Sequence, residues 1–412
     1  MPYSEVEEKP IHELCRIIDC EHKTAPYVDE SEFLVVRTSN VRNGQLVMDD
    51  MKYTTQAGYK EWTQRGAPEF GDVLFTREAP AGETCLVPED KTVCMGQRMV
   101  MLRPNMKKVD PIYLSLILAT EKCKSDILRL SIGSTVSRIN IADIKKLRVA
   151  APPLTEQKKI AKILSTWDKA ITTTEQLLAN SQQQKKALMQ QLLTGKRRLL
   201  DKNGVRFSGE WKKPKLSKLF ERVTTKNNGQ STNVVTISGQ RGLIRQDEFF
   251  KKTVASETLD GYFLIKRGQF AYNKSYSNGY PMGAIKRLNR YEDGVVTTLY
   301  ICFELTDSKK TDSDYWEHYF ESGLLNKGLS QIAHEGGRAH GLLNVKPSDF
   351  LSLVVSVPCL EEQQKIAAAL SASAKEVATL QKKIDTLKKE KKSLMQNLLT
   401  GKVRVRTIGD KE

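Results

Sequence analysis

The chain repeats one stretch of its own sequence, and this repeat constrains the fold more than any other feature. Residues 149–198 and 355–404 match without a gap at 23 of 50 positions, where average residue usage would give roughly three by chance. Each copy begins with a Pro-x-Leu-x-Glu-Gln motif, at Pro152 and Pro358, and ends with Leu-Leu-Thr-Gly-Lys. Proline and acidic residues are typical of a helix start, and glycine of a helix end. The repeat therefore predicts two similar helices.

Apolar residues between these ends alternate in steps of four and three. Such a stripe, held over more than four heptads, is typical of a coiled-coil seam. The predicted seam residues are Ile160, Leu164, Trp167, Ile171, Leu178, Leu188, Leu192, Ile366, Leu370, Val377, Leu380, Ile384, Leu387, Leu394 and Leu398. The weak positions Thr174 and Ser181 of the first copy correspond to leucines in the second. We therefore expect the helices to pair with each other; two independent amphipathic helices, each docked on its own domain, are the alternative.

The length of 412 residues and the repeat together indicate a two-by-two plan. Both regions outside the repeat mix short apolar runs with helical patterns, so the expected fold class is α+β. Antiparallel pairing of the helices would add an internal pseudo-two-fold repeat. The predicted segments are a first globular domain at 1–151, a first long helix at 152–198, a linker at 199–210, a second globular domain at 211–357, a second long helix at 358–404 and a tail at 405–412.

Local patterns predict individual elements within the two globular domains. Runs of β-branched and aromatic residues bounded by turn residues indicate strands, and a period of 3.6 indicates helices. Strands are expected at 33–36, 73–75, 99–102, 234–237, 269–272 and 295–303. Helices are expected at 113–130 and 315–325.

Charge and composition narrow the function. The net charge of +16 and the pI near 9.3 favour a polyanionic partner. No apolar run is long enough for a membrane span and no secretory signal is found, so a cytoplasmic protein is expected. The seven cysteines are predicted to be reduced and mostly buried. His12, Cys15, Cys20 and His22 do not have the spacing of the usual zinc sites, so no metal is expected.

Several motifs carry a resemblance to a known family. They are the openings and closures of the repeat, the central segment 206–211 and the Gly-Ser-Thr-Val-Ser-Arg-Ile-Asn run at 133–140. Together they resemble the specificity subunit of a Type I restriction-modification system, over essentially the whole chain. Segments 19–24, 71–77, 272–275 and 279–281 also look like this family. Cys359, where the first copy has Pro153, departs from the commoner pattern.

This resemblance implies a role without catalysis. It implies two target recognition domains separated by two helices that form an antiparallel coiled coil, and a DNA-binding subunit that reads a bipartite, asymmetric target in double-stranded DNA. The resemblance further implies recruitment of two methyltransferase subunits, which bring S-adenosylmethionine and methylate adenine, and of two restriction subunits, which use ATP and Mg²⁺. No cofactor is expected on this chain. A helical spacer of about 33 residues would be roughly 50 Å long and span roughly 15 base pairs.

Polar loops containing arginine, lysine, asparagine or small hydroxyl residues are the places to expect DNA contacts. Such side chains suit base edges or phosphates. The candidates in the first domain are His22, Lys23, Thr24, Arg37, Asn40, Arg42, Arg77, Ser134, Thr135 and Arg138. Those in the second domain are Lys226, Asn227, Arg241, Asn273, Lys274, Tyr276, Arg338 and His340. For each, a solvated or structural role is the alternative, and Tyr276 is expected to pack rather than to stack on a base.

Two other function classes explain less of the sequence. A self-contained DNA-modifying enzyme is disfavoured because the chain has no Asn-Pro-Pro-aromatic or Asp-Pro-Pro-aromatic motif, no glycine-rich cofactor loop after a strand and no phosphate-binding loop. His334, Glu335 and His340 could suggest a hydrolytic cluster, but the glycines around them fit a flexible loop better. A coiled-coil scaffold without a DNA role explains the seam but neither the charge nor the duplicated domains.

Overall fold

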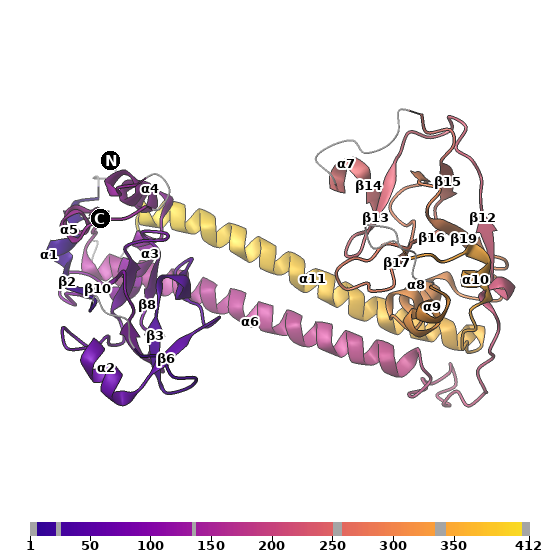
Figure 1. The fold of residues 1–412 in the computed structure, drawn as a ribbon, viewed down its shortest axis with the longest axis horizontal. Coiled ribbons are helices and arrows are strands. Elements are labelled where there is room, and N and C mark those ends of the chain that lie inside the picture. Colours follow the sequence, from indigo (N-terminus) through magenta and orange to yellow (C-terminus); the bar gives the residue numbers. More distant parts are fainter. Residues whose placement is uncertain (1–5, 22–25, 134–136, 250–257, 334–342, 406–412) are drawn as a thin grey trace. The chain divides into compact units, whose positions relative to one another are not determined.

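The computed structural model describes residues 6–21, 26–133, 137–249, 258–333 and 343–405. The chain divides into two compact units, which consist of residues 1–175 with 382–412 and of residues 176–381. We name these the first unit and the second unit. Each unit contains one globular head and parts of both long helices, α6 (Leu154–Leu192) and α11 (Leu360–Leu399) (Figure 1).

A four-stranded antiparallel sheet forms the centre of the first head. Its strands are, in spatial order, β2 (Cys15–Asp19), β10 (Met99–Pro104), β7 (Val73–Thr76) and β8 (Thr84–Leu86). Val73 and Phe75 pack against helices, whereas Leu74 packs on the opposite face against a second sheet. The sheet is thus buried on both faces, which explains its continuous apolar runs.

Smaller elements cover both faces of this sheet. On one side lie α3 (Pro111–Leu118), α4 (Glu121–Leu130), and the buried residues Ile160 and Leu164 of α6. On the other lies a three-stranded sheet with the order β6-β3-β9, in which β3 and β9 are parallel. The bounds of the remaining elements are β1 (Glu8–Pro10), α1 (Ile11–Leu14), β3 (Phe33–Val36), η1 (Thr38–Asn40), β4 (Val41–Arg42), β5 (Gln45–Leu46), β6 (Lys52–Thr54), α2 (Gln56–Trp62), β9 (Thr92–Met95), α5 (Ile141–Lys146) and β11 (Arg148–Ala150).

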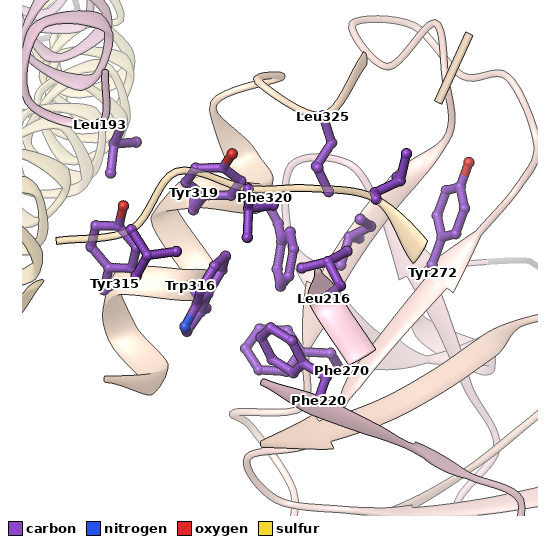
Figure 2. Packing of buried hydrophobic residues seen from close by; sticks show 14 of the residues in the cluster. Leu193, Leu216, Phe220, Phe270, Tyr272, Tyr315, Trp316, Tyr319, Phe320 and Leu325 are labelled. Atoms are coloured by element: carbon purple, nitrogen blue, oxygen red, sulfur yellow. The ribbon is translucent and has the colours of Figure 1, made fainter. Parts of the chain in front are cut away.

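The second head has the same central sheet, although its sequence differs. Its strands are, in spatial order, β12 (Phe220–Val223), β19 (Ile301–Leu305), β16 (Phe270–Asn273) and β17 (Ala284–Arg287). Aromatic rings fill the space between this sheet and α8 (Ser313–Glu321), among them Phe220, Trp316 and Phe320 (Figure 2). Phe220 is edge-on to both Phe303 and Trp316. The other elements are η2 (Leu216–Lys218), β13 (Val235–Ser238), β14 (Gly242–Arg245), α7 (Gln246–Phe249), β15 (Phe263–Lys266), β18 (Asp293–Val296), α9 (Asn326–Ile332) and α10 (Pro347–Ser352).

The long helices pair as an antiparallel coiled coil, as the sequence predicts. Every predicted seam residue is buried or half-buried. In the first unit Asp168 of α6 pairs with Lys391 of α11, and Glu175, further along α6, pairs with Lys388 at 2.7 Å. The later residue of α6 thus pairs with the earlier residue of α11, so the two helices run in opposite directions. A glycine with left-handed φ lies just beyond the end of each helix, with φ of 70° at Gly195 and 72° at Gly401, which is typical of glycine stops.

Each copy of the repeat is held by the end of the other copy. Glu156 at the start of α6 accepts two hydrogen bonds from Arg404, at 2.8 and 2.6 Å. Glu362 at the start of α11 accepts two from Arg198, at 2.6 and 2.7 Å. Both carboxylates are buried, and paired charge-assisted bonds of this kind are strong and directional. The internal pseudo-two-fold repeat is therefore present in individual side-chain contacts.

The glutamines next to these glutamates join the long helices to the heads. Gln157 accepts a hydrogen bond from the backbone N–H of Asp110 at 2.9 Å, and Gln363 accepts one from Asp312 at 2.9 Å. These two aspartates are the N-caps of α3 and α8. The Glu-Gln pair of the repeat thus binds the other copy with one side chain and its own head with the next.

Three local predictions need correction, and the others hold to within a residue or two. The strand expected at 295–303 is two strands, β18 and β19, because a turn closes with the N–H of Tyr300 donating to Thr297 O at 3.1 Å. The helix expected at 113–130 is α3 and α4, because Thr120 caps the second one. The helix expected at 315–325 is α8, which ends at Glu321. No described helix combines the length and apolar content that a membrane span needs.

Candidate nucleic-acid interface

Three polar motifs of the first head meet at one edge of the central sheet. Arg77 follows β7, and its Nη1 lies 3.2 Å from Oδ1 of Asp19 at the end of β2. The backbone N–H of Ile139 donates to the carbonyl of Arg77 at 3.0 Å, and Glu78 forms a β-bridge with Arg138. The flanks of the segments 19–24, 71–77 and 133–140 are therefore neighbours in space, although far apart in sequence.

Arg77 and Arg138 have different surroundings at this edge. Arg77 is only 7% exposed and its guanidinium is engaged by Asp19, so its contacts support the edge. Arg138 has a side chain that is 57% exposed, and its Nε lies 3.2 Å from Glu78. Arg98 approaches the other oxygen of Glu78 at the same distance and is 58% exposed. Arg98 is a candidate that the sequence analysis missed, because no local motif marks it.

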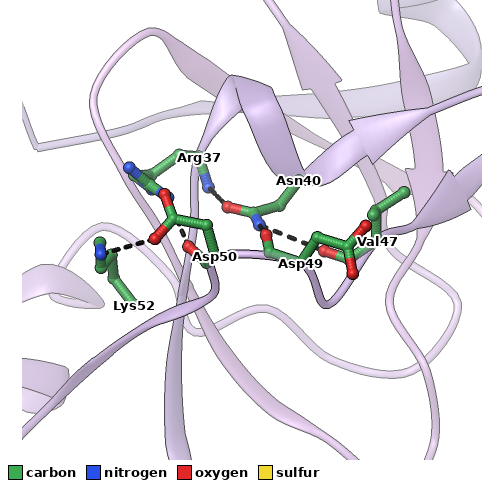
Figure 3. Close-up of polar contacts among 6 residues, drawn as sticks. All are labelled: Arg37, Asn40, Val47, Asp49, Asp50 and Lys52. Carbon is green, nitrogen blue, oxygen red and sulfur yellow. Dashed lines mark hydrogen bonds and ion pairs between the residues drawn. The ribbon is translucent and has the colours of Figure 1, made fainter. Parts of the chain in front are cut away.

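The loop after β3 is held together by its own polar groups (Figure 3). Asn40 is fully buried; its Oδ1 accepts from the N–H of Arg37 at 3.2 Å, and its Nδ2 donates to the carbonyls of Val47 and Asp49, both at 3.1 Å. Arg37 pairs with Asp50 at 2.9 Å. The hydrogen bonds from Lys52 and Arg37 lower the pKa of Asp50 to about 2. Asn40 is thus occupied inside the loop, and we correct its proposed role from base reading to loop stabilisation.

Arg42 is also engaged within this loop. Its Nη1 donates to the carbonyls of Thr38 at 2.7 Å and Val41 at 2.8 Å. Several other candidates lie outside the described residues; they are His22, Lys23, Thr24, Ser134, Thr135, Arg338 and His340, together with His334 and Glu335 of the weighed hydrolytic cluster.

Lys274 takes the position in the second head that Arg77 takes in the first. It follows β16, the counterpart of β7, and its carbonyl accepts from the N–H of Leu343 at 3.0 Å. Its Nζ donates to the carbonyl of Val345 at 3.4 Å. Burial, and then the charge of Arg222, lower the pKa of Lys274. A partly buried cation beside a second cation favours an anionic ligand.

The remaining candidates of the second head are divided between the surface and the interior. Asn227 is fully buried and exchanges two hydrogen bonds of 2.9 Å with the backbone of Ser231, so its assignment as a DNA contact is also corrected to loop stabilisation. Lys226 is exposed, with its Nζ 4.6 Å from the ring centroid of Phe263. Asn273, half-buried, accepts from the N–H of Ser275 at 3.1 Å.

Tyr276 and Arg241 lie at the surface of the same head. Tyr276 is 66% exposed, so the expectation that it packs is wrong, and its ring is accessible for stacking. Arg241 is exposed and lines a hollow of about 850 Å³. The hollow also contains Lys185, Lys286 and Arg290, which the sequence analysis did not select.

Three buried cysteines of the two heads have thiols that are not reactive. Burial raises the pKa of Cys15, Cys85 and Cys302 to about 12, which keeps each thiol neutral and unreactive. Within the described ranges, no three His, Cys, Asp or Glu side chains are grouped so that they could hold a metal ion. The described candidates are thus suited to binding an anion or a base edge by charge and hydrogen bonding.

Comparison with known proteins finds one family. Residues 3–180 match the Type I restriction modification DNA specificity domain. A protein of Methanocaldococcus jannaschii, provisionally named the MjaX type I restriction enzyme specificity subunit, is 27% identical over 364 residues, which cover 82% of this chain and 79% of the relative. The MjaVIII type I restriction enzyme specificity subunit of the same organism is 25% identical over 352 residues, covering 80% of this chain and 78% of the relative. The resemblance indicated by the sequence motifs is thereby confirmed.

A solved structure shows that the fold extends over the whole chain. The S subunit of a Type I restriction-modification system from M. genitalium superposes with a TM-score of 0.60 at 13% sequence identity. The match covers 97% of this chain and 98% of that one. At this identity the likeness concerns the fold, and it agrees with the duplicated heads and paired helices described above.

Proposed function

We infer that this chain is the DNA specificity subunit of a Type I restriction-modification system, which reads a target sequence and catalyses no reaction itself. The observation that carries this inference is the whole-chain match in fold, together with the family match at residues 3–180. The net charge of +16 supports a polyanionic partner. A scaffold without a DNA role and a self-contained enzyme are not supported by any of the matches.

The domain plan is part of the proposal. We assign target recognition domains to 1–151 and 211–357, spacer helices to 152–198 and 358–404, a linker to 199–210 and a tail to 405–412. The shared order of the central strands supports two heads with one ancestry. The loops differ between the heads, so each head reads a different half of a bipartite, asymmetric target.

We propose contacts at the accessible candidates. Among the described residues these are Arg98, Arg138, Lys226, Arg241, Lys274 and Tyr276, whose side chains are exposed or half-buried. Arg77 is buried and paired with Asp19, so we propose that it positions the sheet edge of the first head at which Arg138 lies. Arg37, Arg42 and Asn273 are bonded within their loops and stay predictions, as do the seven candidates that lie outside the described residues.

The partners and cofactors follow from the family. We propose that the chain recruits two methyltransferase subunits that carry S-adenosylmethionine and methylate adenine, and two restriction subunits that use ATP and Mg²⁺. The assembled complex would then be an adenine-N6 DNA methyltransferase and an ATP-dependent endonuclease. We place it in the cytoplasm, associated with DNA.

An exchange of heads tests the proposal. Replacing residues 1–150 with the corresponding head of a relative should change one half of the methylated target and leave the other half intact. The reciprocal exchange of 211–357 is the matched control and should change only the other half. Methylated adenines are mapped across the genome of a host that carries each chimera. Loss of both halves in either chimera, with the complex still assembled, would contradict independent reading by the two heads.

A further inference from the structure

The hollow of about 850 Å³ in the second unit has a basic lining on both of its sides. One side belongs to the head and contains residues of β14, β17 and α8; the other belongs to α6 and α11. Five lysine or arginine residues line it against two glutamates; the basic ones are Lys185, Arg241, Lys286, Arg287 and Arg290. An excess of positive charge in a concave site attracts an anionic ligand.

Two of the five cations are already neutralised. Lys286 pairs with Glu321 and also donates to the hydroxyl of Tyr280 at 2.9 Å. Arg287 lies 2.6 Å from both Asp314 and Glu317. These pairs use both glutamates of the lining, so the excess charge belongs to the other three basic residues.

Those three differ in how much of their charge is compensated. Arg290 lies 3.3 Å from the carboxylate of Glu248. Among the described residues, the only hydrogen bond of the Arg241 guanidinium is with the backbone carbonyl of Glu248, at 3.4 Å. Lys185 is half-buried in the coiled-coil seam. Arg241 and Lys185 are therefore the cations best placed to bind a ligand.

The internal repeat shows what Lys185 lacks. Its counterpart in the first unit, 206 residues later, is Lys391, which pairs with Asp168. The residue equivalent to Asp168 is Ala374, which lines the hollow. The second unit thus has the lysine of this pair but has an alanine in place of the carboxylate.

A second ion pair of the first unit has no equivalent at this place in the second unit. Lys388 and Glu175 pair at 2.7 Å in the first unit. Their equivalents in the second unit are Gln182 and Gln381, and both line the hollow. No carboxylate therefore faces the hollow from the described residues of the two helices. A half-buried lysine without a carboxylate partner is costly unless an anion binds it.

We propose that this hollow binds the phosphate backbone of the target DNA, with Lys185 and Arg241 as the contacts. The proposal rests on the function inferred above and adds that the spacer helices themselves contact DNA. A phosphate would take the place that the carboxylate of Asp168 takes beside Lys391 in the first unit. Contacts of this kind position the protein on the duplex and do not discriminate between bases.

The test compares equivalent lysines of the two copies. The full-length chain in complex with its methyltransferase subunits is titrated with a duplex containing its methylation target and with a scrambled duplex, between 50 and 300 mM KCl. Lys185→Gln should reduce the slope of log K against log salt by about 0.9 and weaken binding about fivefold at 150 mM for both duplexes. Lys391→Gln is the matched control, because its charge is already paired, and it should leave the slope unchanged.

Restoring the carboxylate supplies an independent variant. Ala374→Asp should place an acid beside Lys185, weaken binding to both duplexes and leave the thermal unfolding temperature equal or higher. A slope unaffected by both Lys185→Gln and Ala374→Asp overturns the proposal, as does an equal loss in Lys391→Gln or an effect confined to the target duplex. If the unaltered complex binds target and scrambled duplexes equally, the proposed sequence-reading function fails, whatever the variants do.

Discussion

Tyr113 and Tyr315 occupy equivalent places in the two heads but differ in one hydrogen bond. Each lies three residues after the aspartate that caps its helix, and the tyrosine N–H donates to that aspartate at 3.0 Å in the first head and 2.8 Å in the second. Both are buried, 1% and 0% exposed. The hydroxyl of Tyr113 donates to the carbonyl of Ala150 at 3.0 Å, whereas that of Tyr315 has no partner among the described residues.

Removing each hydroxyl should therefore change stability in opposite directions. Tyr113→Phe loses one hydrogen bond and leaves a carbonyl without its donor, a cost of about 1–2 kcal/mol in the free energy of unfolding. Tyr315→Phe removes a buried hydroxyl whose lack of a partner costs about 1–3 kcal/mol. Part of that gain is offset by lost packing, so we expect a stabilisation of about 1 kcal/mol.

Hydrogen exchange in increasing urea measures both effects, because peptides from each unit report the unfolding of that unit separately. The Tyr113→Phe chain should show a lower unfolding midpoint in peptides of the first unit and no change in the second. The Tyr315→Phe chain should show a raised midpoint in the second unit only. If Tyr315→Phe destabilises its unit as much as Tyr113→Phe does, the Tyr315 hydroxyl has a hydrogen-bond partner and the prediction is wrong.

Three further predictions concern the helices. Arg198→Met leaves the buried Glu362 carboxylate without its paired guanidinium donors and should cost about 3 kcal/mol of unfolding free energy. Adding Glu362→Gln should recover part of this cost. Urea unfolding of the single and double variants measures both changes. Burial, and then the charge of a neighbouring lysine, lower the pKa of His318 below its ordinary value. Below about pH 6.5 the unfolded chain therefore binds more protons than the folded chain, so stability should fall as the pH is lowered through this value. His318→Gln should flatten the plot of urea unfolding midpoint against pH in this range. An unchanged plot would contradict the assignment to His318. Four residues inserted between Leu193 and Thr194 should add about 6 Å if helical, close to two base pairs; methylation mapping should find the same half-sites with a longer spacer, and an unchanged spacer with full activity would show that the helices do not set it.

The candidate DNA contacts show how far local sequence reasoning reaches. It selected residues by type and by nearby motif, and it found Lys274, Arg241 and Arg138, which are accessible. It also selected Asn40 and Asn227, because a buried asparagine that closes a loop has the same local sequence character as an exposed one. Whether the asparagine is buried depends on what the rest of the chain packs against that loop. The residues next to it in the sequence do not indicate this.

The basic hollow shows a second kind of feature that the sequence alone does not reveal. Lys185 looks like an imperfect seam residue in the sequence, and Ala374 like an ordinary helical alanine. Their significance comes from the ion pair between Asp168 and Lys391, which is known only once the antiparallel register brings residues far apart in sequence into contact. The repeat alignment contains the substitution, but only the structure shows that the two positions face each other.

The duplication, the two long helices and their mutual pairing were determined by the sequence alone. The physical reason is that a 3.5-residue apolar period is a local pattern, and that the seams of the two copies complement each other at matching positions. Only the tertiary structure decided that two heads with diverged sequences share one strand order, that Arg77 and Lys274 are equivalent, and that Glu156 binds Arg404. A packed core tolerates many sequences that keep its apolar volume, so common architecture can outlast visible similarity. Contacts between residues hundreds of positions apart form only when the whole chain has folded.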